Sequence, residues 1–533
     1  MKSVQLEYII FRVSIYTLTM STLNNAKAFV TKTAIAMAGP VDSGKSSFVG
    51  VCTTGVLDDG RGSARATVAK HKHEIDAGKT SDISTRILKL DGGKALTFID
   101  LCGHEKYLKT TARGISGHFP DYGCIIVSPQ REVTIVTPQH YKLLLSQNIP
   151  VFIIISRVDV TLEASYKSTR KKIADLLRTG GQKPEFVNGY KHYKALESGE
   201  ITDEKFQEKK NKDIATITEN LMLNKRGKQA TVPVITVSNV DGYYIDVCKA
   251  VMNKLEPRDI WNQDSNNNRI VKIFLDKLKL SQSDINTKFS GSKFHVDTAF
   301  NVDGIGLVVS GILMGEPVKT GDILNIGPFG SDFVQVKIRS MHNNNREPIS
   351  LLEDHGRGCL NITFPKKSTI QIKKPSIRKG VVLVTQDQVP NICFRFKAAI
   401  FIFDKSVSIK PYYSPVINIG TVCQAARVLE DDTFTEEVAD LANGGKRVVK
   451  KVMGPGDIAA MWFKFRQRPE HVIPGSILTF RSGEIHGVGI VLETLPIGQD
   501  DDAKPDETKK KNRVGNAGKA PVNIKYKKVD ISI

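Results

Sequence analysis

The N-terminal part of the chain contains eight residues with the spacing of a phosphate-binding loop. They fit the pattern G-x-x-x-x-G-K-S/T and are Gly39, Pro40, Val41, Asp42, Ser43, Gly44, Lys45 and Ser46. The run follows an apolar segment, 34–38, and precedes a helical pattern that starts at Ser47. Glycines in such a loop let backbone N–H groups converge on phosphate oxygens, while the lysine reaches the β- and γ-phosphates. The run predicts that Gly39 and residues 42–47 bind a nucleoside triphosphate, with Mg²⁺ on Ser46.

A second group of polar residues follows the apolar segment 95–99. Asp100 ends this predicted strand, where a carboxylate linked to Mg²⁺ belongs, and Gly103 can donate its N–H to the γ-phosphate. His104 comes next. A lone histidine is more often structural than catalytic, but one directly after the γ-phosphate sensor can reach the attacking water. We therefore favour the catalytic interpretation of His104, with Lys45 as a second catalytic residue.

Two further segments predict recognition of guanine. Asp159 follows the apolar strand 151–155, and its carboxylate can accept hydrogen bonds from guanine N1 and the 2-amino group. Ser156 and Arg157 stand where the usual pattern has Asn-Lys, so this segment alone would equally fit a solvated loop carboxylate. The order of the segments decides for guanine, because a second base-contacting loop follows the strand 233–237. That loop consists of Ser238, Asn239 and Val240.

These residues need a framework of alternating strands and helices. Short apolar runs at 34–38, 95–99, 123–127, 151–155 and 233–237 are separated by helical patterns, as in a mainly parallel α/β sheet. Charges and glycines interrupt this rhythm over about 180–212, which we interpret as a surface insertion. After about residue 267 the helical signal fades, and strand patterns alternate with turn residues for the length of two β-barrels.

The expected fold is therefore an α/β P-loop GTPase domain followed by two all-β barrel domains. We assign 1–30 to an N-terminal extension, 31–262 to the GTPase domain, and 267–389 and 390–497 to the second- and third-domain barrels. The charged segment 498–533 has almost no apolar periodicity and is expected to be a disordered tail.

The composition of the chain bears on the kind of partner that it binds and on the cellular compartment in which it works. The chain has 533 residues and a net charge of +20, which favours a polyanionic partner. Seven cysteines, an odd number with no C-x-x-C pair, suggest neither a disulfide framework nor a zinc site. The apolar run 8–20 is shorter than a membrane span and contains Arg12. RNA, DNA or an anionic membrane would each satisfy the charge. Together with the family resemblance described next, we expect a cytoplasmic protein that binds RNA and neither membrane nor DNA.

The longest motifs resemble those of elongation-factor-Tu-type translational GTPases. The segments 98–111 and 114–121, with Asp100-Leu101-Cys102-Gly103-His104-Glu105 at their centre, carry this resemblance. Segments 50–62 and 71–81 are similar to one branch of that superfamily, the GTP-binding proteins one and two. Segments 297–311 and 318–322 resemble the second-domain barrel, and 414–421 and 480–489 resemble the third more loosely. The resemblance covers about residues 31–497.

This resemblance implies roles for individual residues. Ser46 and Thr80 would bind Mg²⁺ directly in the GTP state, and Asp100 would bind it through water. His104 would position the hydrolytic water, and Asp42 would hold a monovalent cation beside the phosphates, which makes Asp42 the third catalytic residue. No arginine finger is evident in the sequence, so we expect slow intrinsic hydrolysis that a partner, the ribosome by resemblance, accelerates.

Three functions remain open at this point. The first is an elongation-factor-like monomer that binds aminoacyl-tRNA with its barrels and releases it on the ribosome after GTP becomes GDP. The second is a GTPase of RNA surveillance or decay. The third is a regulatory switch whose barrels bind a protein, and the positive charge of the chain favours the RNA-binding functions over it.

Overall fold

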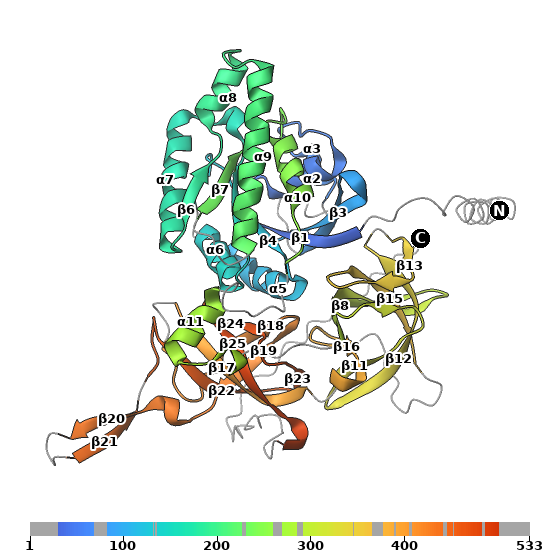
Figure 1. Ribbon diagram of the computed structural model, residues 1–533, viewed down its shortest axis with the longest axis vertical. Helices are drawn as coiled ribbons and strands as arrows, with labels where there is room; N and C mark the ends of the chain where they lie inside the picture. Colours follow the sequence, from blue (N-terminus) through green and yellow to red (C-terminus); the bar gives the residue numbers. More distant parts are fainter. Residues whose placement is uncertain are drawn as a thin grey trace, which may run out of the picture.

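The computed structural model describes residues 30–68, 83–131, 133, 136–225, 231–258, 269–284, 291–344, 346–364, 377–388, 391–403, 408–440, 445–450, 452–481 and 485–499. Figure 1 shows an α/β domain at the top and two β domains below it. The predicted N-terminal extension lies outside the described residues almost entirely, as do the tail from 500 onward and the segment 69–82, which contains Thr80.

The α/β domain is built on a seven-stranded sheet with the order β2-β3-β1-β4-β5-β7-β6. Its strands are β1 (Val30–Ala38), β2 (Ser84–Lys89), β3 (Lys94–Asp100), β4 (Tyr122–Val127), β5 (Val151–Ile155), β6 (Lys183–Phe186) and β7 (Thr231–Thr236). β2 pairs with β3 in the antiparallel direction, and the other pairs are parallel. The sheet confirms the predicted α/β class.

Helices cover both faces of this sheet (Figure 1). They are α2 (Lys45–Thr54), α3 (Ser63–Ala66), α5 (Leu108–His118), α6 (Val136–Ser146), α7 (Glu163–Thr179), α8 (Tyr190–Glu197), α9 (Asp203–Lys225) and α10 (Ile245–Lys254). Successive residues of β1 enter opposite cores: Ile35 and Met37 pack with α2, α9 and α10, whereas Ala34 and Ala36 pack with α5, α6 and α7. A strand buried on both faces reads as a continuous apolar run, which explains why the sequence revealed it.

The segment predicted as a surface insertion is part of the sheet. Lys183–Phe186 forms β6, which pairs in parallel with β7, and α8 and α9 follow. β6 is an edge strand, and such strands tolerate charges and proline because one side lacks a partner strand. Its polar sequence therefore hid its place in the fold.

Both β domains are antiparallel barrels. The second domain arranges β11 (Ile323–Phe329), β16 (Val382–Val384), β8 (Ser292–Val302), β9 (Gly306–Gly315), β15 (Arg357–Thr363) and β12 (Asp332–Asn343) in a ring that the β11–β12 pairing closes. The third domain arranges β22 (Ile458–Phe465), β19 (Val422–Val428), β18 (Val416–Ile419), β24 (Ile477–Arg481), β25 (Ile485–Pro496) and β17 (Ile392–Ile402), closed by β17–β22. The two predicted barrels are thus confirmed as a fold.

The start of the predicted second domain needs a correction. Residues Arg269–Leu278 form a helix, α11, whose Val271 and Phe274 pack against Ala399 and Ile490 of the third barrel. The apolar spacing of 271, 274, 275 and 278 is that of a helix face, so the helical signal extends past 267. The first strand of the second barrel begins at Ser292.

Of the helices that the structure describes, none is long and apolar enough to cross a membrane.

Candidate functional site

The phosphate-binding loop lies at the carboxyl end of β1, between that strand and α2. Gly39 and Gly44 have φ angles of 133° and 85°, which glycine adopts without strain. A Cβ on Gly39 would stand 2.1 Å from the carbonyl oxygen of Ile126, so the loop passes β4 too closely for any side chain. The loop can adopt this conformation because glycine occupies the positions where the backbone turns and where it passes close to β4.

A buried histidine that the sequence did not indicate supports this loop. His140 of α6 accepts a hydrogen bond at Nδ1 from the Gly39 N–H, at 3.0 Å. Burial, with a smaller contribution from the Lys45 charge, lowers the pKa of His140 to about 3. The ring therefore stays neutral at physiological pH and keeps Nδ1 as an acceptor.

Lys45 lies where the loop meets the segment after β3. Its Nζ donates to the carbonyl oxygens of Gly39 and Pro40, at 3.1 and 2.7 Å. Burial lowers the pKa of Lys45, and the charges of Asp100, Cys102 and Asp42 oppose that shift. A Cβ on Gly103 would lie 2.6 Å from Nζ, so the predicted γ-phosphate sensor directly faces the lysine.

The predicted Mg²⁺ residues meet at the start of α2. The Ser46 hydroxyl donates to Asp100 Oδ2 at 2.8 Å, across 54 positions of sequence, and Asp100 is buried. Hydroxyl and carboxylate oxygens are the ligands that Mg²⁺ prefers, together with nucleotide phosphates. Among the described residues there is no cluster of three or more His, Cys, Asp or Glu that could hold a metal ion. Ser46 and Asp100 therefore suit Mg²⁺, while Thr80 lies outside the described residues.

His104 is exposed at the start of a short 3-10 helix, Glu105–Tyr107. Its Nδ1 accepts the backbone N–H of Lys106 at 3.1 Å. In the neutral ring this bond places the proton on Nε2 and leaves that nitrogen as the one that can face a water. The position follows Gly103 directly, so His104 stands at the edge of the phosphate side of the site.

The guanine side is assembled from the ends of β5 and β7. The buried Ser156 hydroxyl lies 2.7 Å from the Ser43 carbonyl oxygen and ties the strand end to the phosphate loop. Asn239 also lies beside the phosphate loop. A Cβ added to Gly44 would be 3.5 Å from Asn239 Nδ2 and 3.5 Å from Ser156 Oγ. Ser238 holds its loop by accepting the backbone N–H groups of Val240 and Asp241, at 3.2 and 3.3 Å.

Buried polar atoms without a hydrogen-bond partner occur throughout the described residues, and those at this site include Ser43 Oγ, Asp159 Oδ1 and Asn239 Oδ1. Unpaired buried polar atoms are costly, so a ligand that paired these atoms would be favoured here. Asp159 Oδ1 is an acceptor where guanine would present its N1–H donor, and the arrangement fits a guanine nucleotide. Arg157, by contrast, adopts a φ of 60° and donates to Gln130 Oε1 at 3.0 Å, so its guanidinium serves the neighbouring loop.

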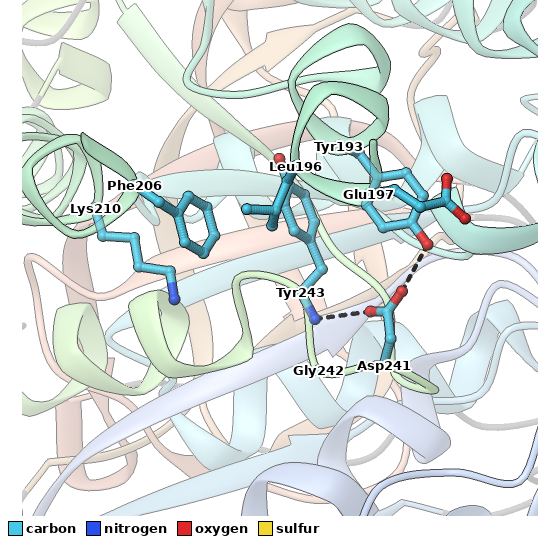
Figure 2. Close-up of a pocket in the computed structure, with 8 residues that line it drawn as sticks. All are labelled: Tyr193, Leu196, Glu197, Phe206, Lys210, Asp241, Gly242 and Tyr243. Carbon is cyan, nitrogen blue, oxygen red and sulfur yellow. Dashed lines mark hydrogen bonds between the residues drawn. The ribbon is translucent and has the colours of Figure 1, made fainter. Parts of the chain in front are cut away.

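A pocket of about 300 Å³ lies behind the second guanine loop (Figure 2). Figure 2 shows Tyr193 of α8 donating to Asp241 Oδ2, at 2.7 Å, while Asp241 Oδ1 accepts the Tyr243 N–H at 2.9 Å. The pocket is lined by Tyr193, Leu196, Glu197, Phe206, Lys210, Asp241, Gly242 and Tyr243. The segment that the sequence suggested as an insertion thus supports the loop that carries Asn239.

An arginine that sequence reasoning missed lies beside the phosphate loop. Arg131, after β4, places Nη2 3.2 Å from Asp42 Oδ2. Asp42 itself has a φ of 60°. No sequence motif marks an arginine at this place, and the parallel pairing of β1 and β4 brings the two loops together.

Comparison with known proteins agrees with this geometry. Residues 31–258 match the family described as the elongation factor Tu GTP binding domain. GTP-binding protein 1 of Xenopus laevis is 29% identical over 488 residues, which are 86% of this chain and 63% of that protein. GTP-binding protein 2 of Homo sapiens is 27% identical over 488 residues, covering 87% of this chain and 69% of that protein. The chain therefore spans about two thirds of the length of these two relatives.

Among solved structures, a bacterial selenocysteine-specific elongation factor is similar with a TM-score of 0.56 and 17% identity, covering 87% of this chain and 58% of that one. Translation elongation factor SelB of Methanococcus maripaludis, in complex with a GTP analogue, gives a TM-score of 0.55 and 18% identity, covering 88% of this chain and 81% of that one. Both likenesses concern the fold, an α/β domain followed by two barrels. Residues 31–258 are thus similar to an elongation-factor-Tu-type GTP-binding domain, and over most of its length the chain is similar to GTP-binding proteins 1 and 2.

Proposed function

We propose that the protein is a GTP-dependent switch that carries aminoacyl-tRNA on its barrels and releases it on the ribosome after hydrolysis. The observation that carries this proposal is one helix, α5, which begins just after His104 and ends against both barrels. A change at the γ-phosphate is thereby transmitted to the surfaces that would hold a partner.

The end of α5 contacts both barrels through a few residues. Arg357 of the second barrel donates to the carbonyl oxygens of His118 and Phe119, at 2.6 and 3.1 Å. The Phe119 ring lies 4.6 Å from that of His295, centroid to centroid, and a Cβ on Gly420 of the third barrel would be 3.0 Å from Phe119 Cζ. Movement of α5 would therefore shift both barrels relative to the sheet.

The chemistry proposed for the site is attack of water on the γ-phosphate. Gly39, Gly44 and the start of α2 bind the phosphates through backbone N–H groups, and Lys45 stabilises their charge. His104 orients the water, and the Gly103 N–H senses the γ-phosphate. Bound Mg²⁺ on Ser46 and Asp100 would neutralise charge on the β- and γ-phosphates.

Two further residues, Thr80 and Asp42, are proposed to bind cations at the site. Thr80 would join the Mg²⁺ ligands in the GTP state, as the resemblance to elongation factors implies. Asp42 would hold a monovalent cation, and this hypothesis competes with the guanidinium of Arg131 that already lies at its carboxylate.

RNA is the partner that the charge favours. The excess of 20 positive charges would attract a polyanion in either nucleotide state, and the relatives found by comparison include proteins named elongation factors. We also propose that the protein is cytoplasmic and acts as a monomer. A surveillance or decay GTPase bound to other RNA is the second candidate, and a switch whose barrels bind a protein is the third.

RNA profiling separates these candidates. The protein, locked with a non-hydrolysable GTP analogue in cells or lysate, would be crosslinked to its RNA, and the same experiment with GDP would serve as control. Enrichment of intact aminoacylated tRNA over the GDP control is the expected result. Enrichment of messenger RNA with decay factors would move the function to surveillance, and no enriched RNA would leave the protein-binding switch.

A further inference from the structure

The Asp42–Arg131 ion pair stands at the edge of the phosphate loop. Asp42 lies between the two glycines that shape the loop and itself has a φ of 60°. Arg131 Nη2 contacts Asp42 Oδ2 at 3.2 Å across 89 positions of sequence. The side chains are 40% and 63% exposed, so water, ions or a ligand can reach both of them.

A carboxylate at this place creates an electrostatic problem. Asp42 lies three residues before the buried Lys45 in the same loop, so its carboxylate would stand on the side of the site that receives the phosphates. A triphosphate brings several negative charges to this loop, and like charges at short range repel one another. A cation beside Asp42 would reduce this repulsion when nucleotide binds.

The loop that carries Arg131 is braced on two sides. The Arg131 N–H donates to the Ser128 carbonyl oxygen at 3.1 Å, which closes a turn directly after β4. Gln130 accepts from Arg157 Nη1 at 3.0 Å and donates to the Val160 carbonyl oxygen at 3.4 Å. The turn is thus tied to the guanine side, and this bracing directs Arg131 toward the phosphate side.

We propose that Arg131 provides, within the same chain, the cation beside Asp42, and that its remaining N–H donors contact the bound GTP. A guanidinium has five donors in a planar fork, so it can bind a carboxylate and a phosphate oxygen together. The inference rests on the proposed GTPase function and goes beyond it, because nucleotide binding and hydrolysis then need no monovalent cation. A site that instead recruits an ion at Asp42 would depend on K⁺ or Na⁺.

The test compares salts at equal ionic strength. Affinity for mant-GTP and single-turnover GTP hydrolysis would be measured in potassium, sodium and choline chloride, with Mg²⁺ constant. For the unchanged protein we expect both quantities to vary less than about twofold among the salts, because the arginine is always charged. For Arg131→Ala we expect affinity and rate in choline to fall about 10- to 150-fold, the range for a hydrogen bond to a charged group. Potassium, or millimolar guanidinium, should restore most of the loss.

Two further variants separate this role from a structural one. Arg178→Ala removes an arginine in a similarly exposed ion pair, with Asp175 at 2.8 Å on α7, and should match the unchanged protein in every salt. Arg131→Lys keeps the charge without the fork and should fall between the unchanged protein and Arg131→Ala. All variants should keep the thermal unfolding midpoint, because exposed ion pairs contribute little to stability.

The inference is overturned if the unchanged protein itself needs K⁺ and Arg131→Ala shows the same salt dependence and affinity. It is also overturned if Arg131→Ala loses activity that neither K⁺ nor guanidinium restores. A folded protein that binds no mant-GTP in any salt would instead refute the proposed function, and the inference with it.

Discussion

The phosphate side and the guanine side of the site are built in different ways. The proposed phosphate side consists of a short run, Gly39 to Ser46, whose backbone would do most of the binding, and its key groups are neighbours in sequence. The guanine side depends on side chains from two strand ends, and its loops are held by Ser156 and by Tyr193 of a distant helix. A local backbone motif can be recognised from sequence, whereas side chains that act in place of the usual residues require the fold.

Ser156 illustrates this difference. It stands where the usual guanine pattern has asparagine, yet its hydroxyl reaches the Ser43 carbonyl oxygen in the phosphate loop. The two sides are therefore connected through one buried serine. Changes on the phosphate side should affect the rate of hydrolysis, and changes on the guanine side should affect affinity and base choice.

The largest effect is expected at His104. His104→Ala should bind GTP with near-normal affinity but lose about 10²- to 10⁴-fold of the ribosome-stimulated hydrolysis rate, because a group that orients water acts in the transition state. Binding of mant-GTP and single-turnover hydrolysis with ribosomes would measure both. An unchanged hydrolysis rate would mean that His104 has only a structural role and does not orient the attacking water.

The next effect concerns base choice. Asp159→Asn should weaken GTP binding by about 10- to 150-fold, since a donor replaces a charged acceptor opposite guanine N1. The same variant should prefer xanthosine triphosphate over GTP in competition binding. If the variant still prefers GTP, Asp159 does not recognise the base, and the proposed guanine side of the site is wrong.

The support of the phosphate loop should depend on pH. The folded pKa of His140 is about 3, below the ordinary value of 6.5, so the fold favours the neutral ring. The stability that depends on this neutral ring is complete above about pH 6.5 and declines by about 1.4 kcal/mol per pH unit as the pH falls toward 3. Denaturant unfolding between pH 7 and 4 should show a steeper loss for the unchanged protein than for His140→Gln. Parallel curves would show that His140 does not hold the loop as described.

The smallest effect is expected at Ser156. Ser156→Ala removes a buried hydroxyl from the Ser43 carbonyl oxygen and should lower guanine-nucleotide affinity by about fivefold, near 1 kcal/mol. Thr161→Ala is a matched control, because its hydroxyl bonds to the Arg157 carbonyl oxygen on the far side of the same loop. Isothermal titration with GDP would compare them, and equal effects would mean that Ser156 does not connect the two sides.

Local patterns predicted much of the fold. The buried strand 151–155 forms β5 with the same bounds, and the phosphate loop lies between a strand and a helix as its pattern requires. The sequence also suggested which residues meet at the carboxyl edge of the sheet, because the ends of parallel strands share that edge. The roles of those residues stay predictions.

Other features could not be found in this way. β6 has the composition of a loop because edge strands tolerate charge. The apolar spacing of α11 is that of a helix, but its packing on a barrel that comes later in the chain could not be read from that spacing. His140 and Arg131 reach the phosphate loop only through the order of β1 and β4, so no spacing in the sequence marks them. Contacts of this kind depend on tertiary structure, which sequence periodicity does not encode.

The central claim is that the state of the nucleotide controls RNA binding by the barrels. Filter binding of aminoacylated and uncharged tRNA would be measured with a non-hydrolysable GTP analogue and with GDP, at two salt concentrations. Electrostatic attraction alone weakens with salt and ignores the nucleotide. The account predicts about 5- to 150-fold tighter binding of aminoacyl-tRNA in the GTP state, corresponding to a coupling of about 1 to 3 kcal/mol. Equal affinity in the two nucleotide states would contradict it.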